Sequence, residues 1–232
     1  MRVLIIGAGG HAQVIADILL CMQEHNNSVQ PIGYLDDNPA LLGQNFLNLP
    51  VLGSIGQLSA IPHDAVIVAV GDNRARQHLF EKLQRQKECF AVARHPSAVV
   101  APDVPIGPGS MICAGAIVRP VSRVSANVIL NTGCTVDHHN CIGDHAHIAP
   151  GVHLGGEVTV SEGTLIGIGS IVMPHCRVGA WSVVGAGAVV INDVPDRVTV
   201  VGVPAKIVKE HKNEARRLLA YYSSDAATPY RG

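Results

Sequence analysis

The apolar positions of the chain follow two different spacings, and the change falls near residue 98. Before it, short aliphatic runs alternate with segments in which apolar residues recur every three or four positions. The runs at 3–6, 31–37 and 66–70 predict strands, and the segments at 11–23 and 73–87 predict amphipathic helices. This order of elements predicts a small α/β, Rossmann-like domain with a parallel sheet over residues 1–98.

From Val100 to Val190 an aliphatic residue recurs every six positions without an insertion. All sixteen of these positions hold Val, Ile or Leu, and fifteen of the sixteen positions four residues further on hold Ser, Ala, Cys, Thr or Val. Neither the helical period nor the two-residue period of a strand explains this spacing. It predicts a parallel β-helix over residues 99–205, in which three hexads form one triangular coil and residues 18 apart stack.

Charge and composition narrow the class of protein. Only nine residues between 100 and 195 are charged, so we expect the prism to pack against copies of itself, most simply as a homotrimer. The formal net charge of −1 gives no basic field for nucleic acid or an anionic membrane. No apolar run is long enough to span a membrane, the N-terminal aliphatics are too few for a signal peptide, and the six cysteines are scattered. These features predict a cytoplasmic protein, with a short helix and a polar tail over 206–232.

A glycine-rich loop at 7–12, GAGGHA, follows the first predicted strand and opens the first predicted helix. Backbone amides at such a helix start favour a bound phosphate. The loop also fits the GxGxxA pattern, with Asp36 placed for a ribose contact, so a nicotinamide cofactor is an alternative. An α/β segment of about 95 residues is roughly half of a full dinucleotide fold, which counts against that alternative. The glycines can also serve only to form a tight turn.

Six of the twelve histidines lie between residues 138 and 175. His138 comes two places after the interior Val136 and is therefore expected to point outward, with Gly156 stacked on it one coil later. The glycine leaves room for a thioester to approach the imidazole. The next column holds a carboxylate between two imidazoles: His139, Glu157 and His175. Acyl transfer from a thioester needs a base such as histidine and backbone donors for the oxyanion.

These motifs carry a family resemblance that covers Arg2 to about Lys209. The hexads, together with GAGGHA, LDD at 35–37, VAVGDN at 68–73 and VDHHNCIGDHAHIAPG at 136–151, resemble the left-handed β-helix acyltransferases. Within that class the chain is similar to the sugar-nucleotide N-acetyltransferases of the bacillosamine-pathway type and to the related sialic-acid O-acetyltransferases. The resemblance implies a left-handed coil, acetyl-CoA as co-substrate, a nucleotide sugar as acceptor, and no metal.

The resemblance also implies roles for particular residues. His138 is expected to be the general base, with His139 beside it where the family often has an acidic residue; Asp137, Asn140 or Glu157 is then left to orient the imidazole. The amide of Gly156 is expected to donate to the oxyanion. The acetyl-CoA groove between protomers is expected to be lined by His147, Gly156, Ile168 and Ala186, with Lys206 near the CoA phosphates. The nucleotide sugar is expected to contact Gly9, Gly10, His11, Asp36, Asp37, Gly71 and Asn73.

The sequence is also compatible with other functions. O-acetylation of a sialic acid uses the same parts, and the sequence does not separate it from N-acetylation at C4 of a deoxyaminosugar. A zinc enzyme of the carbonic anhydrase type would use His138, His139, His145 and His147, although their positions within the hexads point in different directions. A scaffold that only binds a nucleotide sugar is the third alternative. We expect His145 and His153 to be solvated or hydrogen-bonded surface residues, and Cys134 and Cys176 to lie in the core.

Overall fold

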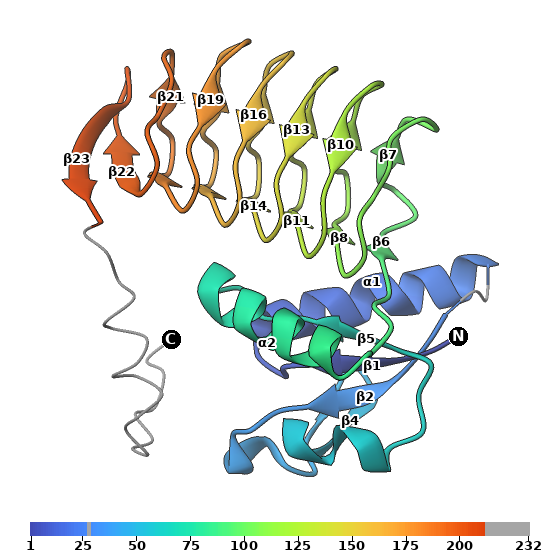
Figure 1. The fold of residues 1–232 in the computed structure, drawn as a ribbon. Coiled ribbons are helices and arrows are strands. Elements are labelled where there is room, and N and C mark those ends of the chain that lie inside the picture. The colour runs from blue at the N-terminus through green and yellow to red at the C-terminus, as the bar shows by residue number, and fades with distance from the viewer. Residues whose placement is uncertain (27–28, 212–232) are drawn as a thin grey trace.

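The computed structural model describes residues 1–26 and 29–211, and its N-terminal part is an α/β domain (Figure 1). The five strands have the order β3-β4-β2-β1-β5, parallel except that β3 runs antiparallel to β4. The elements are β1 (Arg2–Ile6), α1 (Gly10–Asn26), β2 (Gln30–Leu35), η1 (Pro39–Leu41), β3 (Asn45–Phe46), β4 (Leu49–Gly53), η2 (Ile55–Ala60), β5 (Ala65–Val68) and α2 (Asn73–Arg85). The predicted α/β order is confirmed, with element ends shifted by a few residues.

Strand β1 is apolar on both faces because the sheet is covered on both sides. Val3 and Ile5 pack in a cluster with the buried face of α1, whereas Leu4 and Ile6 pack in a second cluster with Phe80 of α2. The loops after β1 and β5 lie next to each other: a Cβ on Gly7 would come within 3.1 Å of the Ala69 carbonyl oxygen. The carboxyl ends of these strands therefore meet at one edge of the sheet, where such folds bind ligands.

The second part is a left-handed parallel β-helix in the form of a triangular prism (Figure 1). Strands pair with a shift of 18 residues, as Ile129 with His147, so three hexads form one coil. The repeating aliphatic positions from Ile112 to Val190 are all at most 3% exposed, and the small residues four positions later are also buried. The predicted six-residue repeat and its interior positions are thus confirmed.

The prism has three sides, which we call the junction side, the second side and the third side. The junction side, next to the α/β domain, contains β6 (Ala93–Arg94), β8 (Met111–Ile112), β11 (Ile129–Leu130), β14 (His147–Ile148), β17 (Leu165–Ile166), β20 (Val183–Val184), β22 (Val198–Val201) and β23 (Lys206–Glu210). The second side contains β7 (Val99–Val100), β9 (Ile117–Val118), β12 (Thr135–Val136), β15 (His153–Leu154), β18 (Ile171–Val172) and β21 (Val189–Val190). The third side contains β10 (Arg123–Val124), β13 (Cys141–Ile142), β16 (Thr159–Val160) and β19 (Arg177–Val178).

The corners follow from the order of the chain. Residues 137–140 and 155–158 connect the second side to the third, and we call this the far corner because it is the vertex opposite the junction side. Residues 125–128 and 143–146 connect the third side to the junction side and form the near corner. Residues 167–170 and 185–188, between the junction side and the second side, form the lateral corner.

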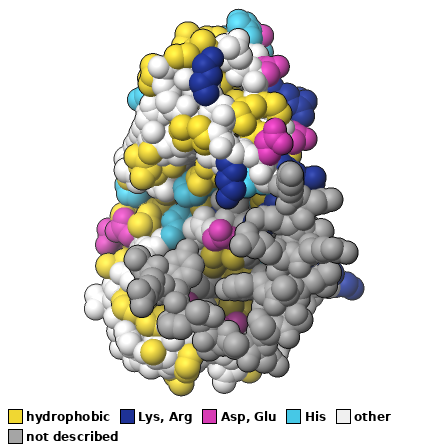
Figure 2. Space-filling model, turned by 90° about the vertical axis from the view of Figure 1, so that its left-hand side faces the viewer, with side chains coloured by type: hydrophobic (Ala, Val, Ile, Leu, Met, Phe, Trp, Pro, Cys, Tyr) yellow, Lys and Arg dark blue, Asp and Glu magenta, His cyan; other side chains and the backbone are white. Residues whose placement is uncertain are grey.

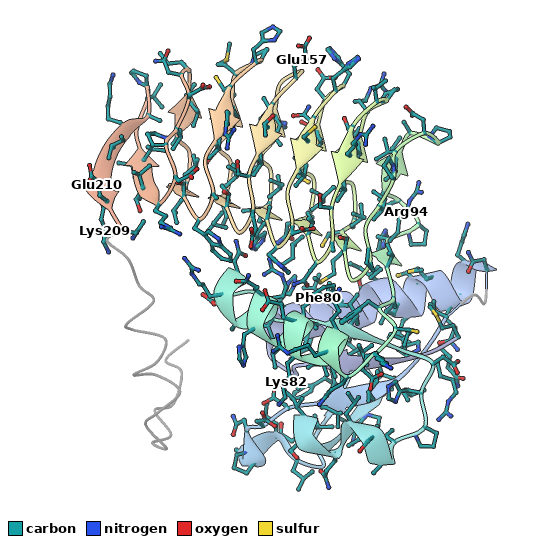
Figure 3. The ribbon with its side chains drawn as sticks, in the orientation of Figure 1. Phe80, Lys82, Arg94, Glu157, Lys209 and Glu210 are labelled. Atoms are coloured by element: carbon teal, nitrogen blue, oxygen red, sulfur yellow. The ribbon has the colours of Figure 1, made fainter. Side chains whose placement is uncertain are left out.

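The α/β domain packs on the junction side through apolar side chains. Met111 and Ile129 point out of the prism, yet both are fully buried in the same cluster as α1. Phe80 of α2 lies where the helix faces the prism (Figure 3). It stacks on Phe90 with ring centroids 4.0 Å apart and meets the ring of His145 edge-on. Burial of large apolar groups on this scale holds the two parts in a fixed relation.

Two expected boundaries differ from the structure. The β-helix begins before residue 98, because Ala93 and Arg94 already pair with β8. Residues 206–210, expected to be helical, form β23 antiparallel to β22, where they pair with the otherwise open edge of that strand. The rest of the expected helix and tail lies outside the described residues. Among the described residues, no helix combines the length and apolarity needed to cross a membrane.

Candidate active site

The far corner carries the expected pairing of His138 with Gly156. His138 is exposed, and a Cβ built on Gly156 would come within 2.6 Å of its Cε1 and 2.8 Å of its Nε2. The imidazole therefore lies over Gly156 in the space that a side chain at this position would occupy. Among the described residues, the Gly156 amide donates to no protein acceptor. The corner thus places an exposed imidazole beside an available backbone donor.

The ring of His138 is oriented by His139. The two Nδ1 atoms lie 3.0 Å apart, and His139 has a φ of 60° that turns its side chain toward its neighbour. One Nδ1 must carry the hydrogen for this contact to be a hydrogen bond. If His138 donates, its Nε2 is unprotonated and available to accept a proton. A base at Nε2 therefore requires His139 to accept at Nδ1.

The three residues expected to orient His138 are engaged elsewhere. Asp137 accepts from the His138 backbone amide through Oδ1 at 2.8 Å, and Asn140 turns inward to donate to the carbonyls of Asp137 and Gly155. Glu157 pairs with His175, with 3.3 Å between Oε2 and Nδ1. The predicted column of His139, Glu157 and His175 exists, but within the described residues the Glu157 carboxylate pairs with His175 and not with His139.

The expected nucleotide-sugar residues gather at the carboxyl edge of the α/β sheet. Gly10 begins α1 and Gly9 precedes it, and both have open space where a Cβ would lie. Asp36 Oδ2 accepts from the Ala8 amide at 2.8 Å, and Asp37 Oδ1 accepts from the Ile55 amide at 2.9 Å. Both carboxylates thus hold the loops in shape.

His11 and His147 form a half-buried pair where this edge meets the prism. Their ring centroids are 6.3 Å apart. His147 Nε2 lies 3.1 Å from Asn131 Nδ2. Burial lowers the pKa of His11 to about 4 and that of His147 to about 3, with the positive charge of Arg76 as a further cause for both. Both imidazoles are therefore neutral near pH 7. His147 was expected in the acetyl-CoA groove, but its neighbours here are residues expected to bind the nucleotide sugar.

This pair predicts sensitivity to mild acid. A histidine whose pKa is lower in the folded state than in the unfolded state stabilises the fold fully above pH 6.5 and progressively less as the pH falls toward 4 and 3. Unfolding then takes up protons at two sites, each contributing on the order of a few kcal/mol. We expect the urea midpoint to fall steeply between pH 6.5 and 4.5, and His147→Gln to flatten this dependence. His153→Ala, at an exposed position, is the control; a wild-type midpoint that is constant over this range would contradict the prediction.

The far corner and the nucleotide-sugar edge lie on opposite sides of one chain. His147 is on the junction side, which faces the α/β domain, whereas His138 is at the opposite vertex. Figure 3 shows Glu157 at the edge of the prism farthest from that domain, and the Glu157 amide donates to the His138 carbonyl at 2.9 Å. Figure 2 shows histidines both near the top of the prism and where it meets the α/β domain. A single chain therefore does not bring His138 to its own glycine loop.

The other residues expected to contact acetyl-CoA lie apart from Gly156. Ile168 and Ala186 stack at the lateral corner, both exposed, and Ile168 is 61% exposed despite being aliphatic. Lys206 is exposed at the start of β23 and lines a cavity of about 340 Å³ at the end of the prism with Val190 and Ile207. A groove between two copies, with the far corner of one against the lateral corner of the next, would bring these residues together.

The remaining histidines and cysteines divide between core and surface. His153 is exposed, with its Nδ1 2.8 Å from the Thr135 hydroxyl, as expected. His145 was expected at the surface but is only 7% exposed, with Nδ1 2.8 Å from Asn127 Nδ2. It is buried because α2 covers the near corner. Cys134 and Cys176 are in the core as expected, and burial raises the pKa of both thiols.

The four histidines of the zinc alternative do not converge. His138 and His139 are at the far corner, His145 is at the near corner, and His147 is on the junction side. Among the described residues, the group whose ligand atoms do approach one another is Asp17, Cys21 and His95. There the His95 Nδ1 accepts from the Ser97 amide, which leaves the hydrogen of a neutral ring on Nε2.

Sequence reasoning missed Arg76 and did not anticipate the structural contacts of Asn73. Arg76 is completely buried, forms no ion pair with a carboxylate in the described part of the chain, and bonds to carbonyls of both parts of the molecule. Asn73 donates to the carbonyls of Gly163 and Thr164 and accepts from Arg76, so its side chain joins α2 to the prism. The one signal of this role in the sequence is that Arg76 lies on the apolar face of the predicted helix 73–87.

Comparison with known proteins agrees with both parts of the fold. Residues 2–83 match the PglD N-terminal domain family. GDP-perosamine N-acetyl transferase from Caulobacter crescentus, solved as a histidine-to-alanine variant with CoA and GDP-perosamine, is 37% identical, with a TM-score of 0.84 over 90% of this chain and 98% of that one. The acetyltransferase domain of PglB from Neisseria gonorrhoeae, in complex with acetyl coenzyme A, is 35% identical, with a TM-score of 0.83 over 89% of this chain and 98% of that one.

The curated relatives match a shorter stretch of the chain. Serine acetyltransferase from Haemophilus influenzae is 32% identical over 105 residues, which cover 41% of this chain and 39% of that protein. The chain thus spans about two fifths of the length of that relative. The two solved structures, in contrast, match both the α/β domain and the β-helix over nearly their full length. The chain therefore belongs to the sugar-nucleotide N-acetyltransferases of the left-handed β-helix, hexapeptide-repeat class.

Proposed function

We propose that this protein transfers the acetyl group of acetyl-CoA to an amino group, at C4, of a nucleotide-linked deoxyaminosugar. The observation that carries the proposal is the far corner, where the exposed His138 imidazole covers Gly156 beside an available amide. A solved relative with CoA and GDP-perosamine bound, 37% identical, favours an amine acceptor over the hydroxyl of a sialic acid.

In the proposed reaction, the amine nitrogen attacks the thioester carbonyl carbon while His138 Nε2 takes the amine proton. The negative charge that develops on the carbonyl oxygen is stabilised by backbone amides, including that of Gly156. The C–S bond then breaks, the acetyl group stays on the sugar nitrogen as an amide, and the CoA thiolate recovers a proton from the His138 imidazolium. His139, by accepting a hydrogen bond from His138 Nδ1, keeps Nε2 directed outward while it takes up the proton and gives it back.

We further propose that the active site is shared between protomers of a homotrimer. Since His138 and the glycine loop lie on opposite sides of one chain, the base of one copy would serve the nucleotide sugar held by its neighbour. The second side supports such packing, because its outward residues include the exposed apolar side chains Val99 and Ile171. The expected cytoplasmic location stays a prediction.

A thiol-release assay tests the reaction. The protein is mixed with acetyl-CoA and a panel of GDP-, UDP-, dTDP- and CMP-linked sugars, with and without a free amino group. We expect turnover only with an amine-bearing nucleotide sugar, unchanged by a chelator, and an acetamide in the product by mass spectrometry. Ester formation on a sialic acid would support O-acetylation instead, and loss of activity with chelator would support a metal enzyme.

A further inference from the structure

Arg76 is the one buried charged side chain that joins the two parts of the described chain, and its partners are unusual. The residue lies on α2 and is 0% exposed. Its Nη2 donates to the carbonyl of His145 at 2.6 Å, and its Nε donates to the carbonyl of Asn127 at 3.2 Å, both at the near corner. Burial lowers the pKa of the guanidinium to about 10, which leaves it charged near neutral pH. The side chain thus brings a full positive charge into the domain junction.

On its other side, the guanidinium holds the loop that follows β5. Its Nη1 donates to the carbonyls of Val70 and Gly71, at 3.2 Å and 3.3 Å. Two successive carbonyls of this loop are therefore turned toward the prism by one guanidinium, which the near corner holds in place.

The direction of these carbonyls determines the direction of two amides. The peptides 70–71 and 71–72 are trans, and in a trans peptide the N–H points opposite to the C=O. The amides of Gly71 and Asp72 therefore point away from Arg76. Both residues are exposed, a Cβ on Gly71 would meet nothing within 4 Å, and in the described part of the chain neither amide donates to a protein acceptor.

The surroundings of these amides suit an anion. They border a cavity of about 270 Å³ that Arg74 and Lys209 also line, and the Arg74 guanidinium lies 3.8 Å from the centre of the Trp181 ring. The Asp72 carboxylate is directed into α2, where Oδ1 accepts from the Ala75 amide at 2.8 Å. The glycine loop that precedes α1 lies next to the loop after β5, since a Cβ on Gly7 would come within 3.3 Å of the Val70 side chain. Exposed backbone amides in such loops and at helix starts are common ligands of a diphosphate.

We infer that Arg76 is a positioning residue for the nucleotide sugar: by holding the carbonyls of Val70 and Gly71 inward, it presents the amides of Gly71 and Asp72 to the diphosphate. This rests on the proposed function. Arg76 touches no substrate itself, and it sets the loop against the same corner of the prism in every copy.

The test compares Arg76→Met and Arg76→Lys with Arg85→Met, an exposed arginine on the same helix. In calorimetric titrations with GDP, UDP, dTDP and CDP, Arg76→Met should lower the affinity for the diphosphate that wild type binds best by about tenfold or more. Arg76→Lys should also lower this affinity, because an ammonium lacks the guanidinium fork that reaches both carbonyls. The Michaelis constant for acetyl-CoA and the Arg85→Met affinity should stay within about twofold of wild type.

The outcomes separate this inference from the proposed function. A folded Arg76→Met protein that binds the diphosphate as well as wild type overturns the inference and leaves the function standing. A wild-type protein that neither binds any of the four diphosphates nor acetylates any sugar of the panel overturns the function. If both Arg76 variants fail to fold, hydrogen exchange of the wild type decides: exchange in residues 70–73 should slow when the diphosphate is added, and unchanged exchange contradicts the inference.

Discussion

Replacing His138 with Ala is expected to lower turnover by about two to four orders of magnitude, while the fold and the assembly persist. The imidazole is exposed at a corner and supports no core contact, so its loss should cost little stability. Without it, the corner loses the imidazole that lies over Gly156 and takes the amine proton as the nitrogen attacks. Steady-state thiol release, with circular dichroism and size-exclusion chromatography on the same samples, checks both halves of this result.

The matched control is His153→Ala, an exposed histidine on the second side whose ring contacts Thr135. It should retain wild-type turnover. If His138→Ala retained turnover as well, His138 would have no part in the reaction.

Placing a methyl group on Gly156 is expected to reduce turnover by about a hundredfold with almost no loss of stability. The new Cβ would lie 2.6 Å from Cε1 and 2.8 Å from Nε2 of His138, so the ring must swing away from its present place. The ring is the end of a flexible, exposed side chain, and moving it strains nothing else. A base displaced by about 1 Å can lose about this much rate.

Gly56→Ala provides the comparison for this second variant. Gly56 lies in the α/β domain, and a Cβ there would meet only the Ser54 hydroxyl at 3.7 Å. It should leave turnover unchanged, and both variants should melt within a few degrees of wild type. A Gly156→Ala protein with normal turnover would show that the imidazole does not act from its place over this residue.

The sequence predicted the parts of the fold that depend on local repetition. A six-residue spacing of aliphatics determines which side chains face inward, and the 18-residue stacking that follows puts His138 under Gly156 without any tertiary information. The same arithmetic placed His139, Glu157 and His175 in one column. It did not give the hydrogen bond between His138 and His139, because a ring's orientation depends on rotamers and on a positive φ that periodicity does not encode.

Features that depend on tertiary packing could not be predicted from the sequence. The repeat pattern predicts His145 at the surface, but it is buried because α2 covers its corner. Asn73 matched a substrate motif, yet its amide joins α2 to the prism. β23 formed because β22 offered an open strand edge. Each outcome depends on which surfaces meet, and residues far apart in the chain carry no common pattern that reveals it.

The most direct measurement of the central claim is complementation between two inactive variants. His138→Ala lacks the base, and Gly9→Glu would place a carboxylate where the glycine loop is to receive phosphate, so each should be inactive alone. When the two chains are refolded together, about a quarter of the sites in random trimers join an intact base to an intact loop from a neighbour. Shared sites predict recovery of turnover toward about that fraction of wild type. If the mixture associates and remains inactive, the base and the nucleotide sugar do not meet between copies.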